Sequence, residues 1–504
     1  MLLNAGLPRL TALFALAALV GLATFAFAFD ADAGSDGDPE FETGRLNAAI
    51  VNPTSLAFGP DGRLYVASLT GVHALSIDPA TKALLDIEEI ASGLTDAVAI
   101  AFDLTTPPEA PVTFYISHRS PIDDGLDSKI SRVTGPDWQM EDVITGLPNS
   151  RPHLNHLTNG LAFDEDGRLF IAQGSSTDAG LTNPPGMAVY WPETPLSAAI
   201  LVVDIHAPDF DGNVTYDQPG PPADHTLNML SGDIAVYATG VRNPFDLVLH
   251  SNGHIYATDN GAVGQEVSLS CTEEGGDSST SDELNLIEEG NYYGFPNRNR
   301  GRFDERECTY RAPEDGNGAD FTAPIAILPS HCSCDGIVEY TVPAFGGAML
   351  GDLIYVEFIR SGVSRAVLSE DGRSVESTST IELGLNGPLD VTVANDGTIY
   401  VTEFNGNDIF YLQPAGGPFP TATPTSPAAP TNTPTHTPTS PPPGLPGDAN
   451  CSGDVSSIDA ALVLQLVAAL IGNVGCPDNA DVNGDGRVDA VDAALILQMV
   501  AGLI

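Results

Sequence analysis

The C-terminal end of the chain contains two copies of one sequence unit, an acidic loop followed by an apolar stretch long enough for a helix. The first loop begins at Asp448 and closes at Asp459, and the second begins at Asp481 and closes at Asp492. The 13 residues from each closing aspartate, DAALVLQLVAALI and DAALILQMVAGLI, match at 10 positions. Two loops in the same register argue against a chance acidic turn, so we expect two copies of one small module.

Each loop has the oxygen pattern of an EF-hand-type calcium site. Such a loop offers side-chain oxygens at positions 1, 3, 5 and 12, a backbone carbonyl at 7, and a glycine at 6 for the sharp turn. The expected ligands of loop 1 are Asp448, Asn450, Ser452, Asp454 and Asp459. Those of loop 2 are Asp481, Asn483, Asp485, Arg487 through its carbonyl, and Asp492. Loop 1 has serine at the fifth position, so we expect loop 2 to bind Ca²⁺ first.

A calcium loop followed by one helix, duplicated and closed by aspartate, resembles the type I dockerin over residues 447–504. The resemblance implies a small α-helical domain, two Ca²⁺ ions and a cohesin-like partner. Dockerins contact cohesins from loop positions 10 and 11, commonly a Ser-Thr pair followed by basic residues. Here those positions are Ser457-Ile458 and Ala490-Val491. As an alternative to contacting a cohesin, the apolar Ile458 and Val491 pack inside the module or against the rest of the protein.

The ends and the charge of the chain place it outside the cell. The N-terminus has Arg9, an apolar run and Ala26-Phe27-Ala28, which predicts a secretory signal peptide over residues 1–28. An uncleaved membrane anchor is the alternative; no other segment is long and apolar enough to span a membrane. The net charge of −48, with Lys82 and Lys129 as the only lysines, argues against nucleic acid as a partner.

Six cysteines in an exported chain predict disulfides. Cys451 and Cys476 are expected to pair across the duplicated module. The other four permit three pairings, and the sequence does not choose between them. They are Cys271, Cys308, Cys332 and Cys334.

A Pro/Thr-rich linker over residues 414–446 separates the calcium module from a large domain, about residues 43–413. That domain repeats a hairpin pattern, with alternating apolar residues on both sides of an Asp-Gly or Asn-Gly turn. The turn glycines are Gly62, Gly167, Gly253 and Gly397. We interpret the gaps between them as two, two and three units of roughly 45 residues, the size of a four-stranded propeller blade. The pattern therefore predicts a mainly β domain, a β-propeller.

Three segments of this domain carry a more specific likeness. They are HLNHLTNGLAF at 153–163, GVRNPFDL at 240–247, and DELNLI at 282–287 followed by NYYGFP at 291–296. Their order and spacing resemble the glucose/sorbosone dehydrogenase family, six-bladed propellers that include soluble sugar dehydrogenases dependent on pyrroloquinoline quinone (PQQ). The resemblance implies oxidation of a sugar with PQQ and Ca²⁺.

The resemblance also implies roles for individual residues. His156 matches the general base, and Arg242 and Asn243 match the pair that faces the cofactor and the reacting oxygen. Gly261 and Ala262 match the carbonyls that hold a calcium ion bridging to PQQ, and Arg360 stands for a family lysine. Glu283 and Tyr293 match a second calcium site.

Each of these positions also has a structural interpretation: His156 as a loop cap, Arg242 as a brace between blades, and Glu283 as a solvated carboxylate. Two positions depart from the family, because Gly160 and the segment 384–390 lack the usual cations. Since PQQ carries three carboxylates, this loss weakens the redox interpretation.

Taken together, the sequence predicts a secreted or cell-surface protein with a six-bladed propeller and a dockerin-like module. We expect a sugar dehydrogenase that the module tethers to a carbohydrate-processing assembly. The alternatives are a non-catalytic propeller that binds glycans or proteins, and a hydrolase with a metal in the central channel.

Overall fold

The structure is a computed structural model, and the chain divides into two compact units, residues 1–423 and 424–504. In the first unit it describes residues 39–120, 127–150, 156–177, 193–217, 228–261, 281–295, 321–330 and 332–415. In the second it describes residues 446–447, 449, 455, 457–467, 474, 476–480, 482–483, 487–488 and 490–500. The expected signal peptide lies outside these residues.

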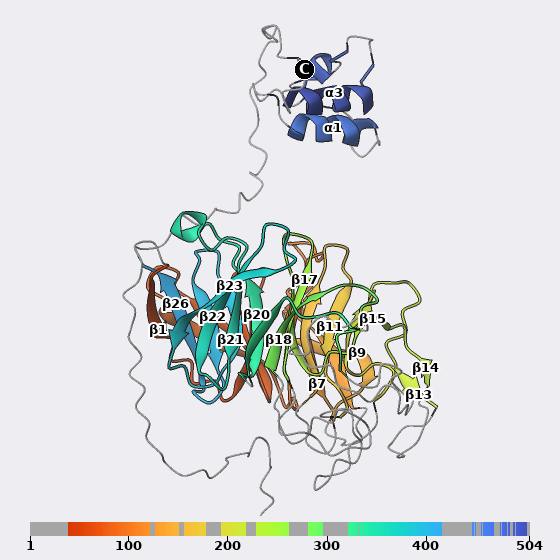
Figure 1. The fold of residues 1–504 in the computed structure, drawn as a ribbon. Helices are drawn as coiled ribbons and strands as arrows, with labels where there is room; N and C mark the ends of the chain where they lie inside the picture. Colours follow the sequence, from red (N-terminus) through yellow and green to blue (C-terminus); the bar gives the residue numbers. More distant parts are fainter. Residues whose placement is uncertain are drawn as a thin grey trace, which may run out of the picture. The chain divides into compact units, whose positions relative to one another are not determined.

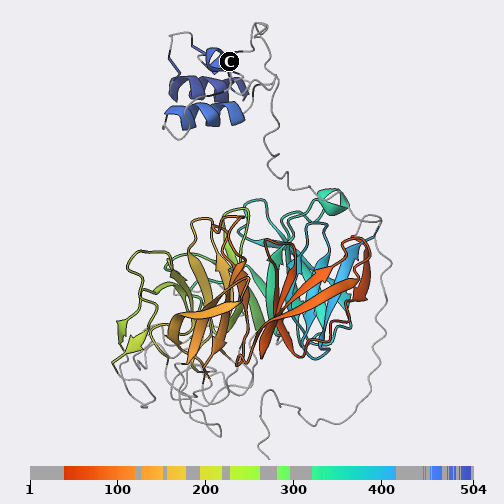
Figure 2. The same ribbon diagram turned by 180° about the vertical axis from the view of Figure 1, so that it is seen from behind.

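The first unit is a β-propeller of six four-stranded antiparallel sheets whose first strands contact one another in a closed ring. Figures 1 and 2 show these blades from two sides. Blade 1 contains β2 (Pro53–Phe58), β3 (Leu64–Ser68), β4 (Gly71–Ile77) and β5 (Leu84–Ser92). Blade 2 contains β6 (Ile100–Phe102), β7 (Thr113–Arg119), β8 (Ser128–Thr134) and β9 (Gln139–Leu147). Blade 3 contains β10 (Thr158–Phe163), β11 (Leu169–Gln173), β12 (Ala199–Val203) and β15 (Ala235–Thr239).

The other three blades follow the same order. Blade 4 contains β16 (Pro244–Leu249), β17 (Ile255–Asp259), β18 (Ser281–Ile287) and β19 (Ala326–Ser330). Blade 5 contains β20 (Cys334–Glu339), β21 (Leu353–Glu357), β22 (Gly362–Leu368) and β23 (Val375–Leu383). Blade 6 contains β24 (Pro388–Val393), β25 (Ile399–Glu403), β26 (Asp408–Pro414) and β1 (Phe41–Arg45). A 3₁₀ turn, η3 (Ala344–Gly347), joins β20 to β21.

The two ends of the unit close the ring. Strand β1 pairs antiparallel with β26, so that Phe41 lies opposite Pro414 and Arg45 lies opposite Phe410. The sixth blade is therefore built from both ends of the domain. This arrangement covers an edge of β26 that an open ring would leave unpaired.

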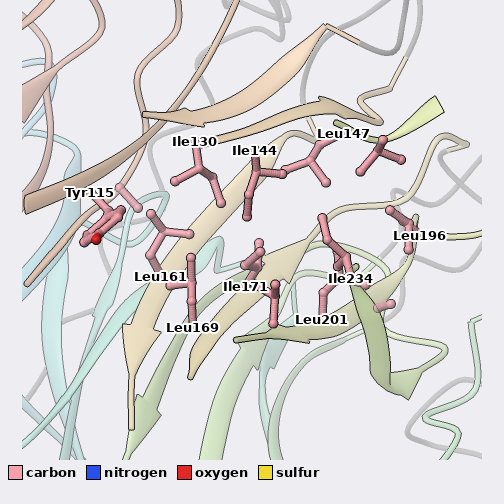
Figure 3. Close-up of a cluster of buried hydrophobic side chains, with 14 of the residues drawn as sticks. Tyr115, Ile130, Ile144, Leu147, Leu161, Leu169, Ile171, Leu196, Leu201 and Ile234 are labelled. Atoms are coloured by element: carbon pink, nitrogen blue, oxygen red, sulfur yellow. The ribbon is translucent and has the colours of Figure 1, made fainter. Parts of the chain in front are cut away.

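The blades pack through apolar residues that the alternating pattern places on both faces of the inner strands. Every residue of β3, β11, β17, β21 and β25, the second strand of five blades, is buried. Between blades 2 and 3, Tyr115 and Ile130 pack against Leu161, Ile171 and Leu201 (Figure 3). The sequence prediction of a mainly β propeller is confirmed.

The interpretation of the spacing between the turn glycines is wrong for two of the three gaps. All four stand at positive φ between the first and second strands of blades 1, 3, 4 and 6, as a tight hairpin turn requires. The steps between them are therefore two, one and two blades. Blade 3 is lengthened by an extra hairpin of β13 (Thr215–Tyr216) and β14 (Met229–Ser231), inserted between its third and fourth strands.

The second unit contains α1 (Ser457–Val467), α2 (Pro477–Ala480) and α3 (Ala490–Val500) around its own small core. Positions 33 residues apart share one environment, as a duplicated module predicts. Ala460 and Ala493 are buried, whereas Leu464 and Leu497 are exposed. Val491 is also exposed, so of the two packings that the alternative allowed, the one inside the module does not hold for this side chain. None of the helices described is long and apolar enough to cross a membrane.

Candidate functional site

A pocket opens where the first strands of the blades begin, and all six blades contribute to it. Its apolar wall consists of Leu69, Val98, Leu157, Phe245, Phe358, Leu389 and Phe404. Its polar wall consists of Thr54, Asp96, Asn159, Asn243, Ser333 and Asp335. A lining that combines three phenyl rings with amide and carboxyl groups suits a flat or ring-shaped ligand with a polar edge.

His156 is buried directly before β10, next to lining residue Leu157. Its amide donates to the Ser150 hydroxyl (3.1 Å), and its carbonyl accepts from the Ser150 amide (2.8 Å). Its Nδ1 lies 2.8 Å from Oγ of Ser175. The Ser175 hydroxyl donates its single proton to the Thr177 carbonyl (2.5 Å), so it accepts from His156. Nδ1 therefore carries the ring proton of the neutral imidazole, and Nε2 carries the lone pair.

Arg242 and Asn243 precede β16 and are held by the carboxylate of Asp259 at the end of β17. The Arg242 amide donates to Asp259 Oδ2 (2.9 Å) and the Asn243 amide to Oδ1 (2.7 Å). The Arg242 guanidinium donates to the Asn260 carbonyl (3.0 Å). Burial raises the pKa of Asp259 to about 7, against the lowering effect of these two amides and of Arg242. The pair is thus fixed by the second strand of its own blade.

The structure brings His156, Arg242 and Asn243 together at the end of β11. A Cβ atom at Gly174 would lie 2.7 Å from the Cβ of His156 and 3.0 Å from Oδ1 of Asn243, so only glycine fits between them. The amide of Ser175 donates to the Arg242 carbonyl (2.8 Å). One short segment therefore contacts both predicted catalytic residues.

The negative charge of two carboxyl groups in the pocket wall is reduced, in one by an ion pair and in the other by a raised pKa. Asp96 pairs with Arg119 (2.7 Å), which also binds Asp127 (2.9 Å). Burial and the neighbouring Asp282 raise the pKa of Asp335 well above its ordinary value, which favours its neutral form. The described wall is consequently much less negative than its formal charges imply.

One departure from the family has a steric cause. At position 160, where the family usually has arginine, a Cβ atom would lie 2.3 Å from Asp246 Oδ1 and 2.7 Å from the Asp246 Cα. Strand β16 approaches β10 too closely here for any side chain. Glycine is therefore imposed by the packing of blades 3 and 4.

The residues around Glu283 suit a cation. Both Glu283 and Asn285 are buried on β18, and the Asn285 amide donates to Glu283 Oε2 (2.8 Å). Oδ1 of Asn285 is buried with no hydrogen-bond partner among the described residues. An orphaned amide oxygen beside a carboxylate is a donor set that Ca²⁺ accepts.

Tyr293 uses its hydroxyl elsewhere. That hydroxyl donates to the Leu286 carbonyl (2.5 Å) and accepts from the Glu288 amide (2.8 Å), at the opposite end of β18 from Glu283. A calcium ligand from Tyr293 would therefore be its backbone carbonyl. The second calcium site stays a prediction.

The remaining predicted cofactor residues are Gly261, Ala262 and Arg360, and the structure describes the first and the last of them. The Gly261 amide donates to Asp282 Oδ1 (3.0 Å), while Ala262 lies outside the described residues. Arg360 is nearly half exposed, pairs with Glu357 (2.8 Å), and does not line the pocket. Arg242 does not line the pocket either, but it directly precedes the lining residue Asn243, whereas neither sequence neighbour of Arg360 is a lining residue.

The cysteine pairing that the sequence left open is settled for one pair. Cys332 and Cys334 form a disulfide across a single residue, and the Cys334 amide donates to Asp282 Oδ2 (3.0 Å). Cys271 and Cys308 lie outside the described residues. In the second unit, Cys476 is disulfide-bonded, and its expected partner Cys451 also lies outside them.

The calcium loops of the second unit are described at their closing ends. Asp459 and Asp492 are fully buried. The Asn483 amide, at position 3 of loop 2, donates to Asp492 Oδ1 at position 12 (3.2 Å), and Arg487 is exposed. This contact joins position 3 to position 12 of loop 2, and calcium binding by the loop stays a prediction. The other expected ligands lie outside the described residues: Asp448, Asn450, Ser452, Asp454, Asp481 and Asp485.

Sequence reasoning did not find Ser175 or Asn285 as site residues. Asn285 stands inside the DELNLI motif and was available from it. Ser175 follows a strand in the run Gly-Ser-Ser-Thr, which is an ordinary turn composition. Only the fold shows that this turn touches His156.

The fold and the pocket define a six-bladed propeller in which a buried histidine and a buried arginine directly precede lining residues of one pocket. The model of the glucose/sorbosone dehydrogenase family matches residues 50–411, and the chain belongs to this family. The model of the dockerin type I domain matches residues 446–501. No curated protein matches the chain.

Solved structures share the propeller at low sequence identity. A glucose dehydrogenase-type oxidoreductase of Thermus thermophilus is 21% identical, with 74% of this chain and 99% of that chain covered and a TM-score of 0.51. A Trichoderma reesei carbohydrate-active enzyme of family AA12, determined with calcium, is 15% identical (76% and 97% covered, TM-score 0.52). The PQQ domain of the Coprinopsis cinerea pyranose dehydrogenase is 12% identical (74% and 98% covered, TM-score 0.50). At these identities the likeness concerns the fold.

Proposed function

We propose that the propeller oxidises a sugar at a hydroxyl or hemiacetal carbon, with His156 as the general base. The observation that carries the proposal is the pair of contacts made by Ser175, which fixes the imidazole of His156 and binds the carbonyl of Arg242. Through this residue the imidazole of His156 and the backbone of Arg242 are held next to the lining residues Leu157 and Asn243 of one pocket.

The chemistry assigned to the chain's own residues is simple. Nε2 of His156 takes the hydroxyl proton of the sugar, a task suited to a group whose ordinary pKa lies near neutrality. The guanidinium of Arg242 stabilises the negative charge that develops on the sugar oxygen. Asn243 and Asn159, which are hydrogen-bonded to each other (2.9 Å), line the pocket and offer amide groups to sugar hydroxyls.

PQQ is the cofactor that we propose for this pocket. Phe245, Phe358 and Phe404 line the pocket and offer apolar faces to a planar quinone. We assign the contact with its carboxylates to Arg242, which directly precedes the lining residue Asn243. When bound, PQQ supplies the acceptor for the two electrons that leave the sugar as hydride. Calcium at Glu283 and Asn285 adds positive charge to blade 4.

The second unit supports a tethering role. A dockerin type I domain with two calcium loops would attach the propeller to a cohesin-like partner in a carbohydrate-processing assembly or at a cell surface. The signal-peptide pattern at residues 1–28 supports export of the protein. Such assemblies and disulfides occur outside the cell.

A glycan-binding propeller without catalysis is the second candidate. The observation that favours it is the same wall of phenyl rings and amides, which also suits an unreacted sugar ring. The two candidates differ in their response to PQQ. The full chain with Ca²⁺, PQQ, an aldose and a reducible dye should turn over if it is a dehydrogenase, whereas a binding protein should bind the aldose without reducing the dye.

A further inference from the structure

Glu193 is a carboxylate enclosed by four donors close to the site. It is fully buried and accepts from the amide of Ser176 (2.8 Å), the amide of Thr177 (2.8 Å), the hydroxyl of Thr177 (2.5 Å) and the hydroxyl of Ser197 (2.5 Å). Burial raises its pKa, and the four donors oppose that rise by favouring the ionised form. No step of the proposed reaction uses this group.

The donors belong to the segment that contacts His156. Two of the four hydrogen bonds come from consecutive backbone amides, those of Ser176 and Thr177. These amides set the orientation of the turn whose Thr177 carbonyl receives the Ser175 hydroxyl proton. If the turn rotated, that proton would be released to point toward His156, and Nδ1 would then become the acceptor.

We propose that Glu193 is a positioning residue for His156, because it holds the turn 175–177 so that Ser175 presents a lone pair to Nδ1–H. Nε2 is thereby kept as the basic nitrogen. The catalytic consequence rests on the proposed function, whereas the tautomer of His156 does not. Outer groups that orient a reactive imidazole in this way commonly change activity about 10- to 100-fold when they are lost.

The four hydrogen bonds to Glu193 require a carboxylate rather than an amide. Each oxygen of Glu193 accepts one backbone amide and one hydroxyl. Glutamine has the same shape but only one acceptor oxygen, so its NH₂ group would face a backbone N–H in either orientation. Glu193→Gln should therefore loosen the turn without opening a cavity.

The test measures the tautomer directly, in the full chain labelled with ¹⁵N-histidine at a pH where the imidazole is neutral. The His156 signals are assigned by their loss in His156→Gln. The wild type should show a protonated Nδ1 and an unprotonated Nε2. Glu193→Gln should show a mixture of tautomers and an approximately 10- to 100-fold lower kcat/KM for aldose oxidation with PQQ and Ca²⁺.

Glu339→Gln is the matched control. Glu339 is also buried and accepts an amide and a hydroxyl, both from Ser251 (2.7 and 2.5 Å), at the opposite end of the strands. This variant should leave the His156 signals and kcat/KM unchanged. A change of similar size in this control would overturn the proposal, because it would show a general effect of losing a buried carboxylate.

A folded Glu193→Gln protein with the wild-type tautomer and rate would also overturn it. If that variant does not fold, Thr177→Val removes one donor to Glu193 and keeps the Thr177 carbonyl. It should shift the tautomer in the same direction by a smaller amount, and unchanged His156 signals would count against the proposal. An inactive wild type would contradict the proposed function, while the tautomer experiment would still decide the role of Glu193.

Discussion

Nδ1 of His156 and Oγ of Ser175 lie 2.8 Å apart, and the proton of this hydrogen bond belongs to the histidine. The assignment follows from the Ser175 hydroxyl, which donates to the Thr177 carbonyl. Because the amide of Ser175 also binds the Arg242 carbonyl, one residue at the end of β11 sets the relation between the proposed base and the proposed electrostatic partner.

Replacing the base should abolish turnover without disturbing the fold. His156→Ala is expected to lower kcat for aldose oxidation about 10²- to 10⁴-fold, the usual contribution of a general base, with PQQ binding nearly unchanged. The measurement is dye reduction by the Ca²⁺- and PQQ-loaded protein. The control is His254→Ala, a half-buried histidine in the β16–β17 turn at the opposite end of the strands from the pocket, which should retain full activity. Equal activity in the two variants would exclude His156 as the base.

The calcium site on β18 can be tested through stability. Asn285→Leu removes the orphaned oxygen, so added Ca²⁺ should raise the thermal unfolding midpoint of the propeller less in this variant than in the wild type. Asn285→Asp keeps an oxygen at the same place and should preserve the calcium-dependent rise. The measurement is calorimetry with and without chelator. An undiminished rise in Asn285→Leu would place the ion elsewhere.

The buried Asp390 should make the propeller less stable as the pH rises. Burial raises the pKa of Asp390 to about 6 from 3.8, so between these values the folded state binds a proton that the unfolded state has released. Its contribution is present below about pH 4 and is lost as the pH rises to about 6. A shift of this size corresponds to about 3 kcal/mol.

Asp390→Asn should therefore flatten the dependence of the free energy of unfolding on pH between 4 and 6. Asparagine keeps one oxygen for the Leu56 amide that Asp390 Oδ2 accepts (3.0 Å). Denaturant unfolding at a series of pH values provides the measurement. Asp371→Asn, at an exposed turn, is the control and should retain the wild-type slope. A slope that is equally steep in both variants would contradict the prediction.

The helical module of the second unit should fold only when calcium is bound. Its core is small and its closing aspartates are fully buried, so without the ion their charges oppose folding. Far-ultraviolet circular dichroism of residues 447–504 should lose most of its helical signal on chelation. Asp492→Ala should cost more helicity than Asp459→Ala, because loop 2 has the more highly charged ligand set. The same spectrum with chelator as with Ca²⁺ would refute this expectation.

The sequence was sufficient for the architecture because that architecture depends on local patterns. Alternating strands around Gly62, Gly167, Gly253 and Gly397 predict hairpins, and the duplicated loops predict the helical module. The count of residues per blade could not be predicted, since the β13–β14 hairpin inserted in blade 3 leaves the packing of the inner strands intact and has no periodic signal. The closure of β1 on β26 likewise depends on pairing between distant ends.

The site was predictable only where a motif lies on one strand or its loop. His156, Arg242 and Asn243 belong to such motifs, and the fold brings them together. Gly160 is explained by the approach of Asp246 from the next blade, which no local pattern reveals. The role of Ser175 depends on the direction of one hydroxyl proton, and Asn285 on the absence of a described partner for one oxygen. Both are properties of three-dimensional packing.

The central claim is that the pocket holds PQQ beside His156. Titration of PQQ into the full, calcium-loaded chain, followed by absorbance and calorimetry, tests it most directly. The account predicts tight, stoichiometric binding, followed by aldose-dependent dye reduction that His156→Ala removes. No binding at high micromolar PQQ would contradict the account and leave a glycan- or protein-binding propeller as its replacement.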